Sequence, residues 1–111
     1  MHELAIARAV VAVATRHARG RRVVRVDLRI GHLRQVVAPA LAFAFELSAR
    51  ETSAEGAAVH MVPVPAAARC AACGAETVLN DFPFACPACT NRDLTIVRGE
   101  ELLVDAIEVE D

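Results

Sequence analysis

Lysine, tryptophan and tyrosine are absent from this chain of 111 residues, and phenylalanine occurs four times. Without lysine, the chain can hold neither a phosphate-binding P-loop lysine nor a lysine that forms a Schiff base. So few aromatic rings offer no platform on which nucleic-acid bases could stack. The cations are twelve arginines, which face fourteen acids for a net charge of −2, and this balance argues against a strongly basic nucleic-acid surface.

The chain also lacks long apolar runs. The longest, residues 36–45, spans ten residues and contains Pro39, whereas a helix that crosses a membrane needs about 20. Glu3 and Arg8 interrupt the stretch where a signal peptide would have its apolar region. We therefore expect a cytoplasmic protein without a membrane partner, in a compartment that keeps cysteines reduced.

Hydrophobic periodicity predicts helices over 3–19 and 39–50, and strands over 23–30, 58–64 and 101–110. In the first strand, four apolar residues alternate with polar ones and are expected to share one covered face: Val24, Val26, Leu28 and Ile30. The last strand changes parity near Asp105 and Ala106, which predicts a β-bulge there.

Residues 66–97 differ in character and hold all four cysteines, between two strands of the expected sheet. The predicted fold class is therefore α+β, with a small mixed three-stranded sheet, two helices and an inserted zinc-ribbon-like domain held by four cysteines. We expect a discontinuous α/β domain over 1–65 and 98–111, and a zinc-binding domain over 66–97.

Two CxxC pairs, Cys70 with Cys73 and Cys86 with Cys89, are separated by twelve residues. A two-residue gap lets one tight turn present two thiolates to one ion, and two such turns complete the tetrahedral shell that zinc prefers. Gly74 follows the first pair, where such a turn often needs a positive φ. The spacing predicts a four-cysteine zinc site, and a structural one, because four thiolates leave no open position for a substrate.

Other chemistries for the cysteines are weaker interpretations. Two disulfides would need an oxidising compartment. A redox dithiol explains one CxxC pair but not two, and a mononuclear iron–sulfur site, which uses similar pairs, stays an open alternative. About thirty residues cannot build a core of their own, so a metal would take its place.

The chain begins Met1-His2-Glu3. A free α-amine has a pKa near about 8 and can lose its proton near neutrality. The amine, the His2 amide nitrogen and the His2 imidazole can chelate one ion in adjacent rings, and the tetragonal nitrogen coordination that results suits Ni(II) and Cu(II). Taken alone, His2 is more simply interpreted as a surface residue.

Together with the two CxxC pairs, this N-terminus resembles the HypA/HybF family of nickel metallochaperones for nickel–iron hydrogenase maturation, over essentially the full length. The remaining resemblance is carried by Leu4, Ile30-Gly31, Pro39, Leu41 to Glu46, Glu55-Gly56, Gly99 to Leu102 and Ile107 to Val109. The chain departs from the family at Ala5, where serine is usual, and at His32, where an acidic residue is frequent.

The resemblance implies that His2 is the essential nickel ligand, with the Met1 amine beside it, and that Glu3 supports nickel binding or transfer. It implies that the four cysteines hold structural Zn(II) and that Ni(II) is a transient cargo. It also implies delivery, with a HypB-type GTPase, to the hydrogenase large subunit, and for some members service to urease and its accessory proteins. Such a protein is not an enzyme.

The other three histidines are interpreted without a metal: His17 as packed or partly buried, His32 as an exposed loop residue and His60 as structural in its strand. The alternative function is a zinc-ribbon module that binds protein or nucleic acid, although the acidic balance and the missing lysine and aromatics count against nucleic acid. An enzyme has little support, because the sequence offers no nucleophile–base pair.

Overall fold

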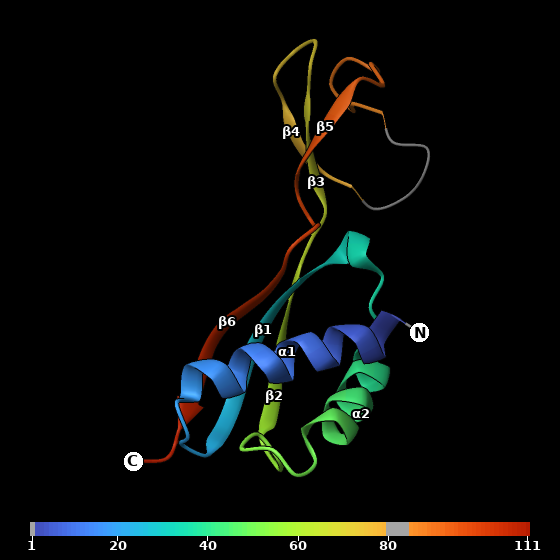
Figure 1. The fold of residues 1–111 in the computed structure, drawn as a ribbon. Coiled ribbons are helices and arrows are strands. Elements are labelled where there is room, and N and C mark those ends of the chain that lie inside the picture. Colours follow the sequence, from blue (N-terminus) through green and yellow to red (C-terminus); the bar gives the residue numbers. More distant parts are fainter. Residues whose placement is uncertain (1, 80–84) are drawn as a thin grey trace. The chain divides into compact units, whose positions relative to one another are not determined.

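The computed structural model describes residues 2–79 and 85–111, which form two helices, one short 3-10 helix and six strands (Figure 1). Their bounds are α1 His2–Ala18, β1 Val23–Gly31, η1 His32–Arg34, α2 Ala38–Ala49, β2 Ala58–Val64, β3 Ala67–Cys70, β4 Glu76–Val78, β5 Leu94–Arg98 and β6 Leu102–Val109. The two helices and the three strands predicted from periodicity are confirmed to within one residue at each end. None of the described helices is long and apolar enough to cross a membrane.

The chain divides into two compact units. The first comprises Met1–Arg29, Val36–Val62 and Leu102–Asp111, and the second comprises Ile30–Gln35 and Pro63–Glu101. The expected cysteine domain, 66–97, lies inside the second unit, which extends a few residues further at both ends and also takes up residues 30–35. The first unit is made of three separate segments of the chain.

The first unit contains most of a three-stranded sheet in the order β2-β1-β6. Gly31 N–H donates to the Glu101 carbonyl at one end of β1, and Glu110 N–H donates to the Arg22 carbonyl at the other, so β6 runs antiparallel to β1. The order of colours along β1 and β2 in Figure 1 shows that these strands run in the same direction, as expected for two strands joined through a helix. The sheet is therefore mixed, as predicted.

Small side chains build the core of the first unit. The buried face of α1 consists of alanine and valine, and α2 contributes Leu41 and Phe45. In β1, Val26, Leu28 and Ile30 are buried as predicted, but Val24 is 40% exposed and Val23 is buried in its place. That part of the prediction is wrong, because Val24 and Arg25 are exposed in succession and shift the alternation by one residue.

The structure tests two further predictions, one for His17 in α1 and one for the middle of the edge strand β6. His17 is exposed rather than packed, and its Nδ1 lies 3.0 Å from the Val13 carbonyl oxygen. In β6, Asp105 and Ala106 are exposed in succession, so the alternation of burial shifts at the position where the sequence predicts a bulge.

The second unit contains three short antiparallel strands in the order β4-β3-β5, which periodicity did not resolve. Ala66, Ala68 and Leu79 are its buried apolar cluster, with Leu33, Leu94 and Ile96 partly buried against them. A core of three small or medium side chains cannot by itself offset the conformational entropy of about forty ordered residues. The unit needs another source of stability.

Candidate metal centres

The two CxxC pairs lie in turns of the same design. In the first, Cys70 N–H donates to the Ala75 carbonyl (2.9 Å) and Gly74 N–H donates to the Cys70 carbonyl (2.9 Å). In the second, Cys86 N–H donates to the Asn91 carbonyl (2.8 Å) and Thr90 N–H donates to the Cys86 carbonyl (2.7 Å). The residue that follows each pair has a positive φ, +76° at Gly74 and +63° at Thr90. The positive φ predicted at Gly74 is confirmed. The positive φ at Thr90 could not be predicted from the sequence, because a β-branched residue rarely adopts the left-handed region.

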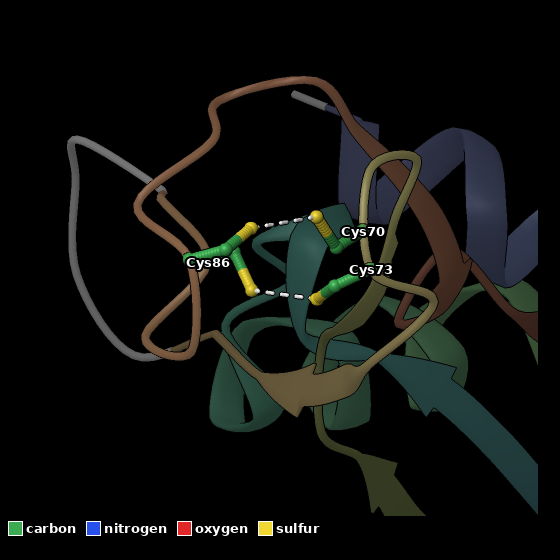
Figure 2. A group of neighbouring side chains, drawn as sticks. Cys70, Cys73 and Cys86 are labelled. Carbon is green, nitrogen blue, oxygen red and sulfur yellow. Dashed lines mark hydrogen bonds between the residues drawn. The ribbon is translucent and has the colours of Figure 1, made fainter.

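The turns bring all four sulfurs together, with every Sγ within 4.8 Å of the others. Cys70 Sγ lies 3.5 Å from Cys89 Sγ, and Cys73 Sγ lies 3.6 Å from Cys86 Sγ. Figure 2 shows Cys70 and Cys73 in one loop and Cys86 in a second loop that faces it. With Zn–S bonds of about 2.3 Å, sulfurs at the corners of a tetrahedron lie about 3.8 Å apart. The cluster therefore has the dimensions of a tetrahedral metal site.

The four sulfurs also influence one another's protonation. The backbone N–H of Cys73 lowers the pKa of the Cys70 thiol to about 7. For Cys89 the N–H of Asn91 has the largest single effect and acts in the same direction. The Cys70 sulfur, burial and the other two cysteine sulfurs together outweigh it and raise the pKa of Cys89 to about 12. A cation held by these sulfurs would have to displace protons, chiefly from Cys89, so its affinity falls as pH falls.

The second candidate centre is at the N-terminus, where His2 and Glu3 open α1. His2 Nε2 lies 3.3 Å from Glu3 Oε2, but the His2 side chain is 55% exposed and that of Glu3 only 13%. The Val37 N–H, at the start of α2, donates to Glu3 Oε2 (3.2 Å) and holds the pKa of this carboxyl below its usual value. The sequence did not reveal this contact. It holds the Glu3 carboxylate at the start of α2, while the His2 imidazole beside it is open to solvent. Met1, the other expected nickel ligand, lies outside the described residues.

The remaining histidines are exposed at separate places. His32 lies in η1 and lines a cavity of about 260 Å³ in the second unit, whose other lining residues are apolar. His32 is exposed, as expected, but it begins a short 3-10 helix and does not lie in a loop. His60 is exposed on β2. Among residues 2–79 and 85–111, neither belongs to a group of three or more side chains that could hold a metal ion.

Comparison with known proteins adds evidence of descent. The family described as "Hydrogenase/urease nickel incorporation, metallochaperone, hypA" matches residues 1–109. Hydrogenase maturation factor HypA of Geotalea uraniireducens is 43% identical over 110 residues, which cover 99% of this chain and 100% of that protein. The protein of the same name from Nostoc punctiforme is 39% identical over 111 residues, which cover 100% and 97%.

Two solved structures share the fold. A solution structure of HypA protein covers 99% of this chain and 97% of its own, with a TM-score of 0.74 and 22% identity. The solution structure of the Ni metallochaperone HypA from Helicobacter pylori covers 96% of each chain, with a TM-score of 0.68 and 20% identity. The fold is thus common to chains that differ at most positions.

Proposed function

This chain belongs to the HypA family, and we propose that it is a nickel metallochaperone that binds Ni(II) at Met1, His2 and Glu3. It would pass the ion, with a HypB-type GTPase, to the large subunit of a nickel–iron hydrogenase in the cytoplasm. Urease and its accessory proteins are a second class of client, since the family's description includes both enzymes. The proposal assigns the chain no catalytic step.

The observation that carries the nickel site is the arrangement of the first two described residues. The His2 imidazole is open to solvent, while the Glu3 carboxylate beside it is held by the Val37 amide. The ligand atoms at the end of the chain can therefore turn toward a partner without disturbing the core of the first unit. Because a terminal amine, an amide and an imidazole leave one tetragonal position open, a partner's ligand can attack the ion there.

The four-cysteine cluster has a different role in this proposal. Its dimensions suit zinc, and Cys70, Cys73, Cys86 and Cys89 would hold the ion through all four coordination positions. Zn(II) supplies structural stabilisation there, in a unit whose apolar core is small. Nickel, the cargo, would bind at Met1, His2 and Glu3 and not at the cysteines.

The test is a calorimetric titration of Ni(II) at neutral pH into zinc-loaded protein with its native N-terminus. The comparison is the same protein with an added N-terminal Gly-Ser. We expect one ion per chain for the native protein and loss of that binding after extension, because the extension removes the free amine from Met1. Equal binding by both would move the site elsewhere, with His32 the next residue to substitute. Binding by neither would leave a zinc-stabilised interaction module.

His2→Ala is the side-chain test of the same site. It should abolish the one-to-one nickel binding and leave the zinc content and the far-ultraviolet circular dichroism unchanged. His60→Ala and His17→Ala are matched controls, because both histidines are exposed in the first unit away from the N-terminus. Unchanged nickel stoichiometry in His2→Ala would disprove the assignment.

A further inference from the structure

Strand β6 forms one edge of the three-stranded sheet in the first unit (Figure 1). Near its two ends, the backbone of Glu101 bonds to Gly31 and that of Glu110 bonds to Arg22. Between these bonds, successive residues direct their backbone N–H and C=O groups alternately toward β1 and away from it, with one interruption where the burial pattern shifts at residues 105–106. Four residues therefore direct these groups to the free edge: Leu102, Val104, Ile107 and Val109.

An apolar groove accompanies this edge on the side of α1. It has a volume of about 250 Å³, and a second hollow of about 180 Å³ follows the same two elements as far as His17. The groove is lined by Ile6, Ala9 and Val13 from the helix and by residues 102–104 from the strand. Because the side chains of a strand alternate between two faces, every second side chain of a strand added beside β6 would enter this space. Apolar side chains suit those positions.

The face of β6 turned away from α1 is acidic at the free edge. Residues 100–111 include six of the fourteen acids of the chain and no arginine. Glu108 and Glu110 are exposed, alternate with the half-buried residues 107 and 109, and form no ion pair within residues 2–79 and 85–111. A strand added beside β6 would therefore meet unpaired carboxylates on its second face.

We propose that β6 is the addition site for an extended, cationic segment of a partner protein. The segment would pair with the free edge through its main chain. Its apolar side chains would fill the groove beside α1, and its arginine or lysine side chains would alternate with them and face Glu108 and Glu110. The inference does not depend on the proposed nickel site, although Ile6 places one end of the groove one helical turn from His2.

Charge also distinguishes this occupant from a second copy of the chain, which an open edge could otherwise recruit. Pairing of β6 with its own copy would gather two sets of carboxylates, and like charges that face each other destabilise a strand pair. Strand β1 offers no free cation to offset them. Its two arginines are already paired, Arg25 with Asp27 and Arg29 with Asp105.

The helix side of the groove fixes the orientation of the segment. The only acid of α1 is Glu3, in the first turn, and its carboxylate already accepts from the Val37 N–H. At the other end of the groove the helix presents His17. The cations of the segment therefore belong on the face turned away from α1.

The test uses isotope-labelled, zinc-loaded protein of full length and a peptide probe. The probe has eight residues, the length of β6, with valine and arginine in alternation and both ends blocked. One control peptide has glutamate in place of arginine. A second keeps the arginines but is N-methylated along both edges, so that it retains the charge and cannot pair as a strand.

The matched variants change the charge of the protein by the same amount at different places. Glu108→Arg with Glu110→Arg reverses the charge beside the free edge. Glu46→Arg with Glu55→Arg is the control, because both acids are exposed in the first unit outside β6. Titration calorimetry measures peptide affinity, and NMR hydrogen exchange locates the bound peptide.

We expect the dissociation constant of the arginine peptide to rise about tenfold or more in the β6 variant and less than twofold in the control variant. Both control peptides should bind at least about tenfold more weakly, and added salt should weaken the binding of the arginine peptide. The complex should show slower amide exchange at four residues of the free edge: Leu102, Val104, Ile107 and Val109.

Several results would overturn the inference. They are no binding of the arginine peptide, equal binding of its N-methylated form, and equal losses in the two variants. Self-association that strengthens with salt while no peptide binds would assign the edge to a second copy. Nickel affinity should stay unchanged in both variants, so failure of this inference and failure of the proposed nickel site are distinguishable.

Discussion

Individual glycines in this protein serve two different physical needs. Gly31 has extended backbone angles that any residue could adopt, but a Cβ there would overlap the carbonyl carbon and oxygen of Gly99. Gly20 and Gly74 have positive φ values with open space around them. The first glycine is needed for close packing of two chain segments and the others for a turn.

Replacing Gly31 by alanine should therefore destabilise the protein by about 3 kcal/mol or more, since backbone atoms must move to admit the methyl group. Gly20→Ala should cost about 1 kcal/mol, the penalty of an alanine in the left-handed region. Chemical denaturation of the metal-loaded variants measures both values. Equal losses would show that Gly31 and Gly99 do not approach each other as closely as described.

At the scale of elements, one hydrogen bond connects the beginnings of the two helices. The Glu3 carboxylate in α1 accepts from the Val37 N–H directly before α2. Pro39, near the start of α2, fits the predicted helix start, but nothing in the sequence pairs it with the first turn of α1. The same carboxylate faces His2, so the link between the helices also sets the surroundings of the proposed nickel ligand.

This hydrogen bond should make the region sensitive to acid. The pKa of Glu3 is lower in the folded protein than its ordinary value of 4.5, chiefly because of the Val37 N–H. Its contribution to stability is thus fully present above pH 4.5 and is lost as pH falls through the lower folded pKa. The Val37 amide proton shift, followed by NMR, should titrate with a midpoint below 4.5. In Glu3→Gln that transition should disappear; its persistence would assign the shift to another group.

The two cysteine turns show how one design tolerates different residues. Gly74 and Thr90 occupy equivalent places, and Thr90 Oγ1 donates to the Cys89 carbonyl (2.6 Å), a contact that glycine cannot make. Gly74→Ala should weaken the first turn by about 1–2 kcal/mol, and Gly74→Asn by less, since asparagine tolerates the left-handed region. Thermal unfolding of zinc-loaded protein, compared with Ala72→Ser in the same turn as control, tests the order. A larger loss for asparagine would contradict the backbone explanation.

At the scale of the whole molecule, the two units draw on different sources of stability. The first buries the apolar faces of two helices against a sheet, whereas the second buries only a few small side chains and gathers four sulfurs. Its strands β3, β4 and β5 have three to five residues each, which is short for strands that must stabilise themselves. We therefore expect the second unit to depend on a bound ion far more than the first.

Removing the metal should unfold the second unit and leave the first unit folded. With a strong chelator at neutral pH, we expect the amide resonances of the second unit to collapse into the unfolded range while those of α1 and α2 stay dispersed. Cys73→Ser should give the same pattern without chelator, and Ala72→Ser should not. Uniform loss of dispersion across both units would show that the first unit also requires the ion, and no loss would show that the ion is dispensable for folding.

The sequence by itself determined the main elements of the first unit and the gathering of the four cysteines. Apolar periodicity located both helices and the three strands of the mixed sheet, because one-sided burial leaves a regular pattern in the residues. The spacing of Cys70, Cys73, Cys86 and Cys89 predicted their convergence, because a two-residue gap is a local geometric requirement. Both are short-range properties, so they can be read without knowing the fold.

Only the tertiary structure decided the contacts between distant segments. The approach of Gly31 to Gly99, the Val37 hydrogen bond to Glu3 and the groove that α1 lines with β6 all join residues far apart in the chain. Such contacts depend on how complete elements pack, and any one residue has the same local preferences with or without them. The candidate metal-donor atoms can therefore be identified from the sequence, whereas their exposure to a partner is decided by the fold.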